Sequence, residues 1–203
     1  MGTYGDMQSR IADELARSDL TSQIQKAVES AIDYYTGTRF WFTEGEFTVN
    51  TVASTASYAL PTGLEEVDVA TATVSSNRYE IDPESYEWIR DNLPLTTMTG
   101  RPTKYAIFEE YLWIYPVPDA VYVMTFSGTK TIAVPANSGT SNEWTVEAEQ
   151  LIRHRAKWDL FFNIIRNDKE ASKMQAAEQM FYQILMKRTA GRISSGKLKP
   201  TRW

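Results

Sequence analysis

The spacing of apolar residues changes twice along this chain of 203 residues. It follows a helical repeat up to about residue 39, a strand-like repeat of two within 40–142, and a helical repeat again within 144–188. Helices and strands segregated in this way define an α+β protein. We therefore expect a helical bundle formed by the N- and C-terminal helices, residues 1–39 and 144–188, with residues 40–142 inserted as a β-rich module.

The amino-terminal segment carries clear helix signals. Thr3 and Asp6 have the spacing of a capping box, which predicts a first short helix. After Asp19, apolar residues recur at helical spacing as far as Tyr35, and Gly37 is placed to end this second helix.

The middle segment predicts short strands, because apolar residues alternate there. Glu44-Gly45 is the expected first turn, and Asp82-Pro83 is expected to begin a short helix towards Pro94. Residues 127–143 are rich in small polar residues and predict an exposed loop. The alternating residues are Phe40 and Phe42; Phe47 and Val49; Tyr58 and Leu60; Val67, Val69 and Thr71; Tyr105 and Ile107; Leu112 and Ile114; and Tyr122, Met124 and Phe126.

Two long helices are expected to close the fold, one over about 145–166 and one over about 168–188. Beyond them lies an extended carboxy-terminal arm, residues 189–203. The last seventeen residues, from Lys187, hold six basic side chains and no acidic one, whereas residues 1–186 carry a net charge of −11. Such an asymmetry is typical of an arm that docks on a partner, although a solvated end is the alternative.

Composition excludes several classes of protein. The chain has no cysteine, so disulfides, thiolate zinc sites and cysteine nucleophiles are excluded. Neither a secretion signal nor an apolar run long enough to cross a membrane is visible, and we expect a soluble protein of a reducing compartment. Phosphate-binding glycine motifs are also lacking.

Candidate catalytic residues are few. The one histidine, His154, lies between two arginines in a predicted helix, where a surface position is the default interpretation. Paired carboxylates at Glu44 with Glu46, and at Glu109 with Glu110, leave glycoside hydrolysis open, since that reaction needs two acids. We predict no catalytic residue, metal site or cofactor. A cell-wall glycan hydrolase remains the alternative.

Nucleic-acid binding is a third alternative. Arg153, Arg155 and Lys157 could contact phosphates together with the basic arm. The net charge of −11 on residues 1–186 opposes this, because it repels a polyanion. A DNA-binding accessory factor is therefore the weaker interpretation, and DNA that passes without specific binding is the better one.

Several stretches together resemble the head-to-tail adaptor (connector) proteins of tailed bacteriophages. They are TYGDMQSRIADELARSDL with the helix that follows, RFWFTEGEFTVNT, SYALP, GRPTKYAIFEEYLWIYPVP, and the helical pair after Trp144. The chain is more distantly similar to the tail accessory factors of short-tailed phages.

The resemblance implies a structural protein of the virion neck that is found in the host cytoplasm during assembly. It implies a ring of twelve copies beneath the portal protein, which extends the DNA channel and provides the tail attachment site. The helices would form the ring, the β-rich module would face a downstream tail or neck protein, and residues 189–203 would dock on the portal protein. The expected docking residues are Arg192, Ile193, Lys197, Leu198, Lys199, Arg202 and Trp203.

Overall fold

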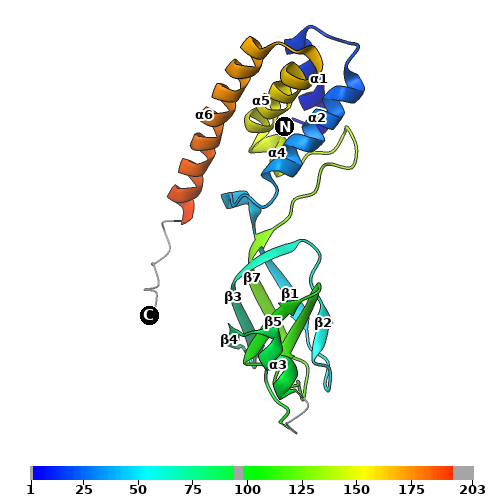
Figure 1. Ribbon diagram of the computed structural model, residues 1–203. Coiled ribbons are helices and arrows are strands. Elements are labelled where there is room, and N and C mark those ends of the chain that lie inside the picture. Colours follow the sequence, from blue (N-terminus) through cyan, green and yellow to red (C-terminus); the bar gives the residue numbers. More distant parts are fainter. Residues whose placement is uncertain (1, 94–97, 194–203) are drawn as a thin grey trace. The chain divides into compact units, whose positions relative to one another are not determined.

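The computed structural model describes residues 2–93 and 98–193 and shows a mixed α+β protein (Figure 1). The chain divides into two compact units. The helical unit comprises residues 1–43 and 132–203, and the β unit comprises residues 44–131. Each has its own hydrophobic core. The predicted fold class, α+β with the strands inserted between helical ends, is confirmed at this level.

The helical unit is organised around α5 (Glu149–Asp159), which packs against α1 (Tyr4–Leu15), α2 (Thr21–Tyr35) and α6 (Asp168–Ile193). The short helix α4 (Glu143–Val146) precedes α5, and a π-helical turn, η2 (Leu160–Ile165), follows it. The apolar faces of these helices enclose one core cluster. Figure 1 shows α6 running alongside α5 within this unit.

The predicted helix signals at the amino terminus are confirmed. Thr3 accepts a hydrogen bond from the backbone of Asp6, whose carboxylate in turn accepts one from the backbone of Thr3. Helix α2 ends at Tyr35, and Gly37 follows with a φ of +87°, a backbone conformation that glycine adopts without strain.

The prediction of a strand at Phe40 and Phe42 is wrong. Phe40 precedes the 3-10 turn η1 (Trp41–Thr43), and Phe42 lies within it. The hydroxyl of Thr43 donates to the Phe40 carbonyl oxygen. Both rings pack against Trp144 in the core of the helical unit, with centroids 6.2 and 5.4 Å from its ring. Aromatic packing therefore determines the conformation of this segment. Two alternating apolar residues are too few to distinguish a turn from a strand in the sequence.

The two closing helices also differ from their predicted bounds. The first is divided, since α4 ends at Val146 and α5 begins at Glu149. The second, α6, continues to Ile193, so residues 189–193 of the predicted extended arm are helical. Thr189 explains the extension, because it is buried and its hydroxyl donates to the Leu185 carbonyl oxygen and accepts from the backbone N–H of Trp41.

The β unit contains one sheet with the strand order β1-β7-β3-β4-β5-β6-β2 among the described residues. All neighbouring strands are antiparallel except β4 and β5. One short helix, α3 (Tyr86–Asn92), lies between β4 and β5 in the chain. The strands are β1 (Glu44–Asn50), β2 (Ser57–Ala59), β3 (Leu64–Val74), β4 (Asn77–Pro83), β5 (Lys104–Phe108), β6 (Tyr111–Tyr115) and β7 (Val123–Lys130).

Strand β3 contains two irregularities in its pairing with β7. The second lies between Val67 and Val69, so Val67 packs on the core whereas Val69 is exposed. Between the two irregularities Val67 pairs with Gly128 on β7, where a Cβ atom would lie 1.8 Å from the backbone oxygen of Glu66, so only glycine fits there. The expectation that Val67 and Val69 share one face is wrong because a bulge shifts the alternation.

Three further local predictions in the β unit are wrong. Glu44-Gly45 is not a turn but the start of β1, which pairs with β7 from its first residue. Asp82-Pro83 does not begin a helix but ends β4, where the backbone N–H of Asp82 donates to the Thr103 carbonyl oxygen. The helix α3 is capped by Ser85 instead. Residues 127–130 of the predicted loop belong to β7. In each case ladder hydrogen bonds to a distant strand override a local turn signal.

Within the described residues, no helix has the length and apolar character that a membrane crossing requires.

Candidate functional site

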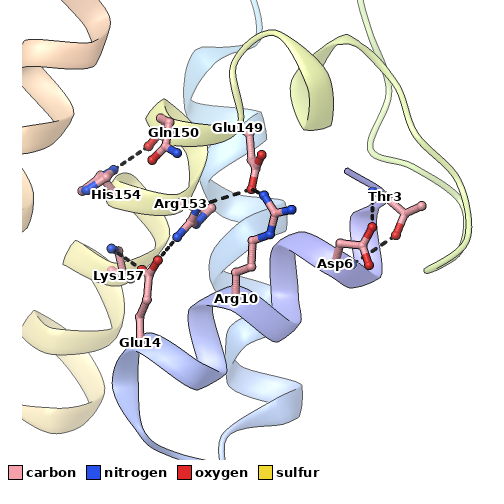
Figure 2. Close-up of polar contacts among 9 residues, drawn as sticks. All are labelled: Thr3, Asp6, Arg10, Glu14, Glu149, Gln150, Arg153, His154 and Lys157. Carbon is pink, nitrogen blue, oxygen red and sulfur yellow. Dashed lines mark hydrogen bonds and ion pairs between the residues drawn. The ribbon is translucent and has the colours of Figure 1, made fainter. Parts of the chain in front are cut away.

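Five charged side chains join α1 to α5 in the helical unit, and we call them the charge cluster: Arg10, Glu14, Glu149, Arg153 and Lys157 (Figure 2). Glu14 pairs with Arg153 and, at 2.6 Å, with Lys157. Glu149 pairs with Arg10 at 2.7 Å and with Arg153 at 3.3 Å. Arg153 thus links both carboxylates.

The two central cations of the charge cluster are buried, with side chains of Arg153 and Lys157 each 8% exposed. Burial, together with the neighbouring Arg153 charge, lowers the pKa of Lys157 to about 8. Burial also lowers the pKa of Arg153. Both carboxylates are therefore needed to offset the cost of placing these cations between helices, and the cluster holds α1 on α5.

His154 lies on α5 next to the charge cluster, but it takes part in packing. Its Nδ1 donates to the Gln150 carbonyl oxygen at 2.7 Å, as Figure 2 shows, and its ring stacks on Phe181 with centroids 5.0 Å apart. Burial lowers the pKa of His154, which favours the neutral imidazole at physiological pH. The histidine is half-buried rather than on the surface as predicted.

A second polar contact joins α2, α5 and α6. The hydroxyl of Tyr35 donates to Glu178 Oε1 at 2.5 Å, and Arg155 Nη1 lies 3.5 Å from the same oxygen. Glu178 is only 2% exposed. Burial and this carboxylate raise the pKa of the Tyr35 hydroxyl, which therefore stays protonated and keeps donating.

The predicted docking residues fall in two groups. Arg192 and Ile193 form the end of α6, where the Arg192 guanidinium lies 4.6 Å from the centre of the Trp41 ring. Arg192 therefore contributes to the fold of the helical unit. The other five lie outside the described residues: Lys197, Leu198, Lys199, Arg202 and Trp203.

The paired carboxylates occupy exposed positions in the β unit. Glu44 and Glu46 lie on β1, two residues apart. Glu109 and Glu110 form the turn between β5 and β6, both with positive φ. The described part of the chain contains no group of three or more histidine or acidic side chains arranged to hold a metal ion.

Charge is distributed unequally between the units. The β unit has 13 acidic and 5 basic residues, a net charge of −8. The helical unit has 13 acidic and 16 basic residues, a net charge of +3. The negative net charge of residues 1–186 is thus concentrated in residues 44–131.

Sequence reasoning missed the charge cluster. The sequence feature that could have revealed it is the spacing of charged residues on α5. Glu149, Arg153 and Lys157 recur every four residues and so lie on one helix face. The partner Glu14 is 143 residues away from Lys157, and no local pattern identifies it.

The described residues thus form two compact units, and in one of them buried ion pairs join two helices. The model of the SU10 adaptor protein family matches residues 2–201, and the chain belongs to this family. The resemblance to phage head-to-tail adaptors is confirmed by this match, which gives the chain a structural role as an adaptor in the virion neck, associated with other neck components. A comparison with curated proteins found no match.

Proposed function

We propose that this adaptor assembles into a ring of twelve copies beneath the portal protein, extends the DNA channel and carries the tail attachment site. The observation that supports the proposal is the family match, which covers both units and nearly the whole chain. A ring uses a heterologous contact, in which one face of a copy meets a different face of the next. The helical unit would form this contact, and the β unit would face the next neck or tail component.

Electron microscopy of the purified protein mixed with portal-bearing heads tests the ring directly. The expected result is a ring of added density beneath the portal. Heads that bind no protein, or bind it without a ring, would contradict the proposal. Cell-wall clearing by the same preparation would favour the hydrolase alternative instead.

The portal contact is proposed for the carboxy-terminal arm, on the basis of its charge and of its apolar residues Leu198 and Trp203. The deletion that tests it must begin after α6, because Thr189 and Arg192 contact the fold. A chain without residues 194–203 is expected to keep its melting temperature and lose attachment to heads. The variant Lys197→Glu/Lys199→Glu/Arg202→Glu is the full-length counterpart, and normal attachment of both variants would refute the docking role.

The channel is proposed to repel DNA, so that it slides past during ejection. The net charge of −5 on the whole chain supports a wall that does not hold a polyanion. Binding of the assembled ring to duplex DNA is expected to be undetectable at physiological salt. Tight binding that falls steeply as salt rises would instead favour the DNA-binding alternative.

A further inference from the structure

Strand β1 is an edge of the sheet, because it pairs only with β7 among the described strands. The Thr51 N–H donates to the Tyr122 carbonyl oxygen, which continues the register of this pair. Hydrogen bonds in an antiparallel pair fall at every second residue, so the odd-numbered residues of β1 bond to β7. The N–H and C=O groups of Glu46, Thr48 and Asn50 therefore point away from β7, and no other backbone–backbone hydrogen bond to them is found in the described part of the chain. Such an edge can accept a further strand.

The side chains of β1 specify what kind of strand fits. Glu44 and Glu46 are exposed on one face, whereas Phe47 and Val49 are partly buried on the other and pack on the β-unit core. Since side chains alternate along a strand, the matching partner has a cation at every second residue and an apolar residue between. A second β unit fits poorly, because two units at −8 repel one another.

The carboxy-terminal arm has this pattern in Lys197, Leu198 and Lys199. Its last ten residues also carry the whole net positive charge of the helical unit. The described residues of that unit hold 13 acidic and 13 basic side chains, whereas residues 194–203 hold three basic side chains and no acidic one. Charge complementarity therefore favours the arm as the segment that covers the edge of a unit at −8.

The point at which the arm leaves α6 favours β1 of the same chain. The Arg192 guanidinium lies 4.6 Å from the centre of the Trp41 ring, and the Thr189 hydroxyl accepts from the Trp41 N–H. Glu44 follows Trp41 by three residues, and Lys197 follows Arg192 by five. Two spare residues, about 7 Å of extended chain, are thus available to cross from the end of α6 to the edge. A tethered segment also binds at a high effective concentration.

We infer that the arm adds to the free edge of β1 in its own chain as a short parallel strand. Lys197 lies beside Glu44 in this register. Lys199 lies beside Glu46, and Leu198 covers the apolar face of the edge. The inference goes beyond the proposed neck function, because the contact occupies the arm in the free protein and the portal protein has to displace it. It also covers an edge that is otherwise open to aggregation.

The test measures amide proton exchange by NMR in the full-length protein, at Thr48 and Asn50. Their N–H groups face the free edge, so an added strand slows their exchange with water. The arm variant is Lys197→Glu/Lys199→Glu, which reverses the two charges beside the edge. Both amides are expected to exchange about threefold or more faster in this variant than in the wild type.

Two further sets of variants separate the contact from a general effect of charge. Lys26→Glu/Lys169→Glu makes the same change of net charge at exposed lysines of the helical unit, and should leave exchange within about 1.5-fold of the wild type. Glu46→Lys alone should speed exchange, and Glu46→Lys/Lys199→Glu should restore it, because the opposite charges face each other again.

Equal exchange at Thr48 and Asn50 in the wild type and the arm variant would overturn the inference. Failure of Lys199→Glu to rescue Glu46→Lys would overturn the parallel register. Slowing that increases with protein concentration would overturn the assignment to the same chain, since it identifies the arm of another copy. The free protein is measured throughout, so these results are independent of the attachment to heads that tests the proposed function.

Discussion

The hydroxyl of Tyr35 donates a 2.5 Å hydrogen bond to the carboxylate of Glu178, which lies 143 residues further along the chain. This contact fixes α6 on α2. The other oxygen of the carboxylate, Oε2, has no hydrogen-bond partner among the described residues. The buried carboxylate therefore depends on Tyr35 and on the more distant Arg155.

Tyr35→Phe is expected to destabilise the helical unit by about 1–3 kcal/mol, because it removes a donor from a buried charged acceptor. Urea denaturation followed by circular dichroism measures the change. Tyr34→Phe is the control, since Tyr34 is its exposed neighbour in α2 and keeps its ring. Equal effects of the two substitutions would show that the hydrogen bond contributes nothing specific.

Glu14→Ala is expected to destabilise the protein by about 2–4 kcal/mol, since it leaves the buried cations of Arg153 and Lys157 short of a carboxylate. Asp13→Ala removes a neighbouring acid of α1 for which no ion pair is seen in the described residues, and it should change stability by less than about 0.5 kcal/mol. Thermal unfolding of both variants distinguishes the cluster from a general effect of charge. If the Glu14→Ala protein were as stable as the Asp13→Ala protein, the charge cluster would not contribute to the stability of the fold.

Gly128→Ala is expected to cost about 3 kcal/mol or more, because its Cβ would lie 1.8 Å from the backbone oxygen of Glu66. The backbone of β3 cannot move aside without breaking its ladder with β7. Gly100→Ala is the control within the β unit, since a Cβ there would have no atom of the described residues within 4 Å apart from its chain neighbours. Near-ultraviolet circular dichroism should show loss of β-unit packing in the first variant and none in the second.

Stability is expected to fall at acid pH through Asp19. Its hydrogen bond with Arg17 lowers the pKa of Asp19 from 3.8 to about 2 in the folded protein. Between those values the unfolded chain binds more protons than the folded one, so the contribution of Asp19 is present above pH 3.8 and is lost as the pH falls through about 2. The difference in melting temperature between wild type and Asp19→Asn should therefore shrink over this range. Arg17→Gln should remove the same dependence, and an unchanged profile in both variants would contradict the assignment.

Local signals predicted the helices well. The capping box at Thr3 and Asp6 and the apolar repeat of α2 involve residues a few positions apart, so the sequence contains all of the information. The alternating residues of β5, β6 and β7 were also sufficient to predict strands.

The failures have a common cause in contacts between distant residues. Phe40 and Phe42 follow the spacing of a strand, but Trp144 holds them in a turn. The bulge between Val67 and Val69 is stabilised by pairing with β7, and no local pattern indicates it. The candidate site was missed for the same reason, because Glu14 is brought to α5 only by the folded chain.

The antiparallel pairing of Glu44 with Thr129 has a consequence for how such adaptors diversify. The chain leaves the helices at Thr43 and returns at Ile132 through neighbouring strands, so the two junctions are adjacent in space. Because its two ends are adjacent, the insertion of 88 residues joins the flanking helical segments across a distance that a short loop could also span. An insertion of any other size whose ends meet in the same way fits the same junctions, so evolution can replace the inserted unit and leave the helical unit intact.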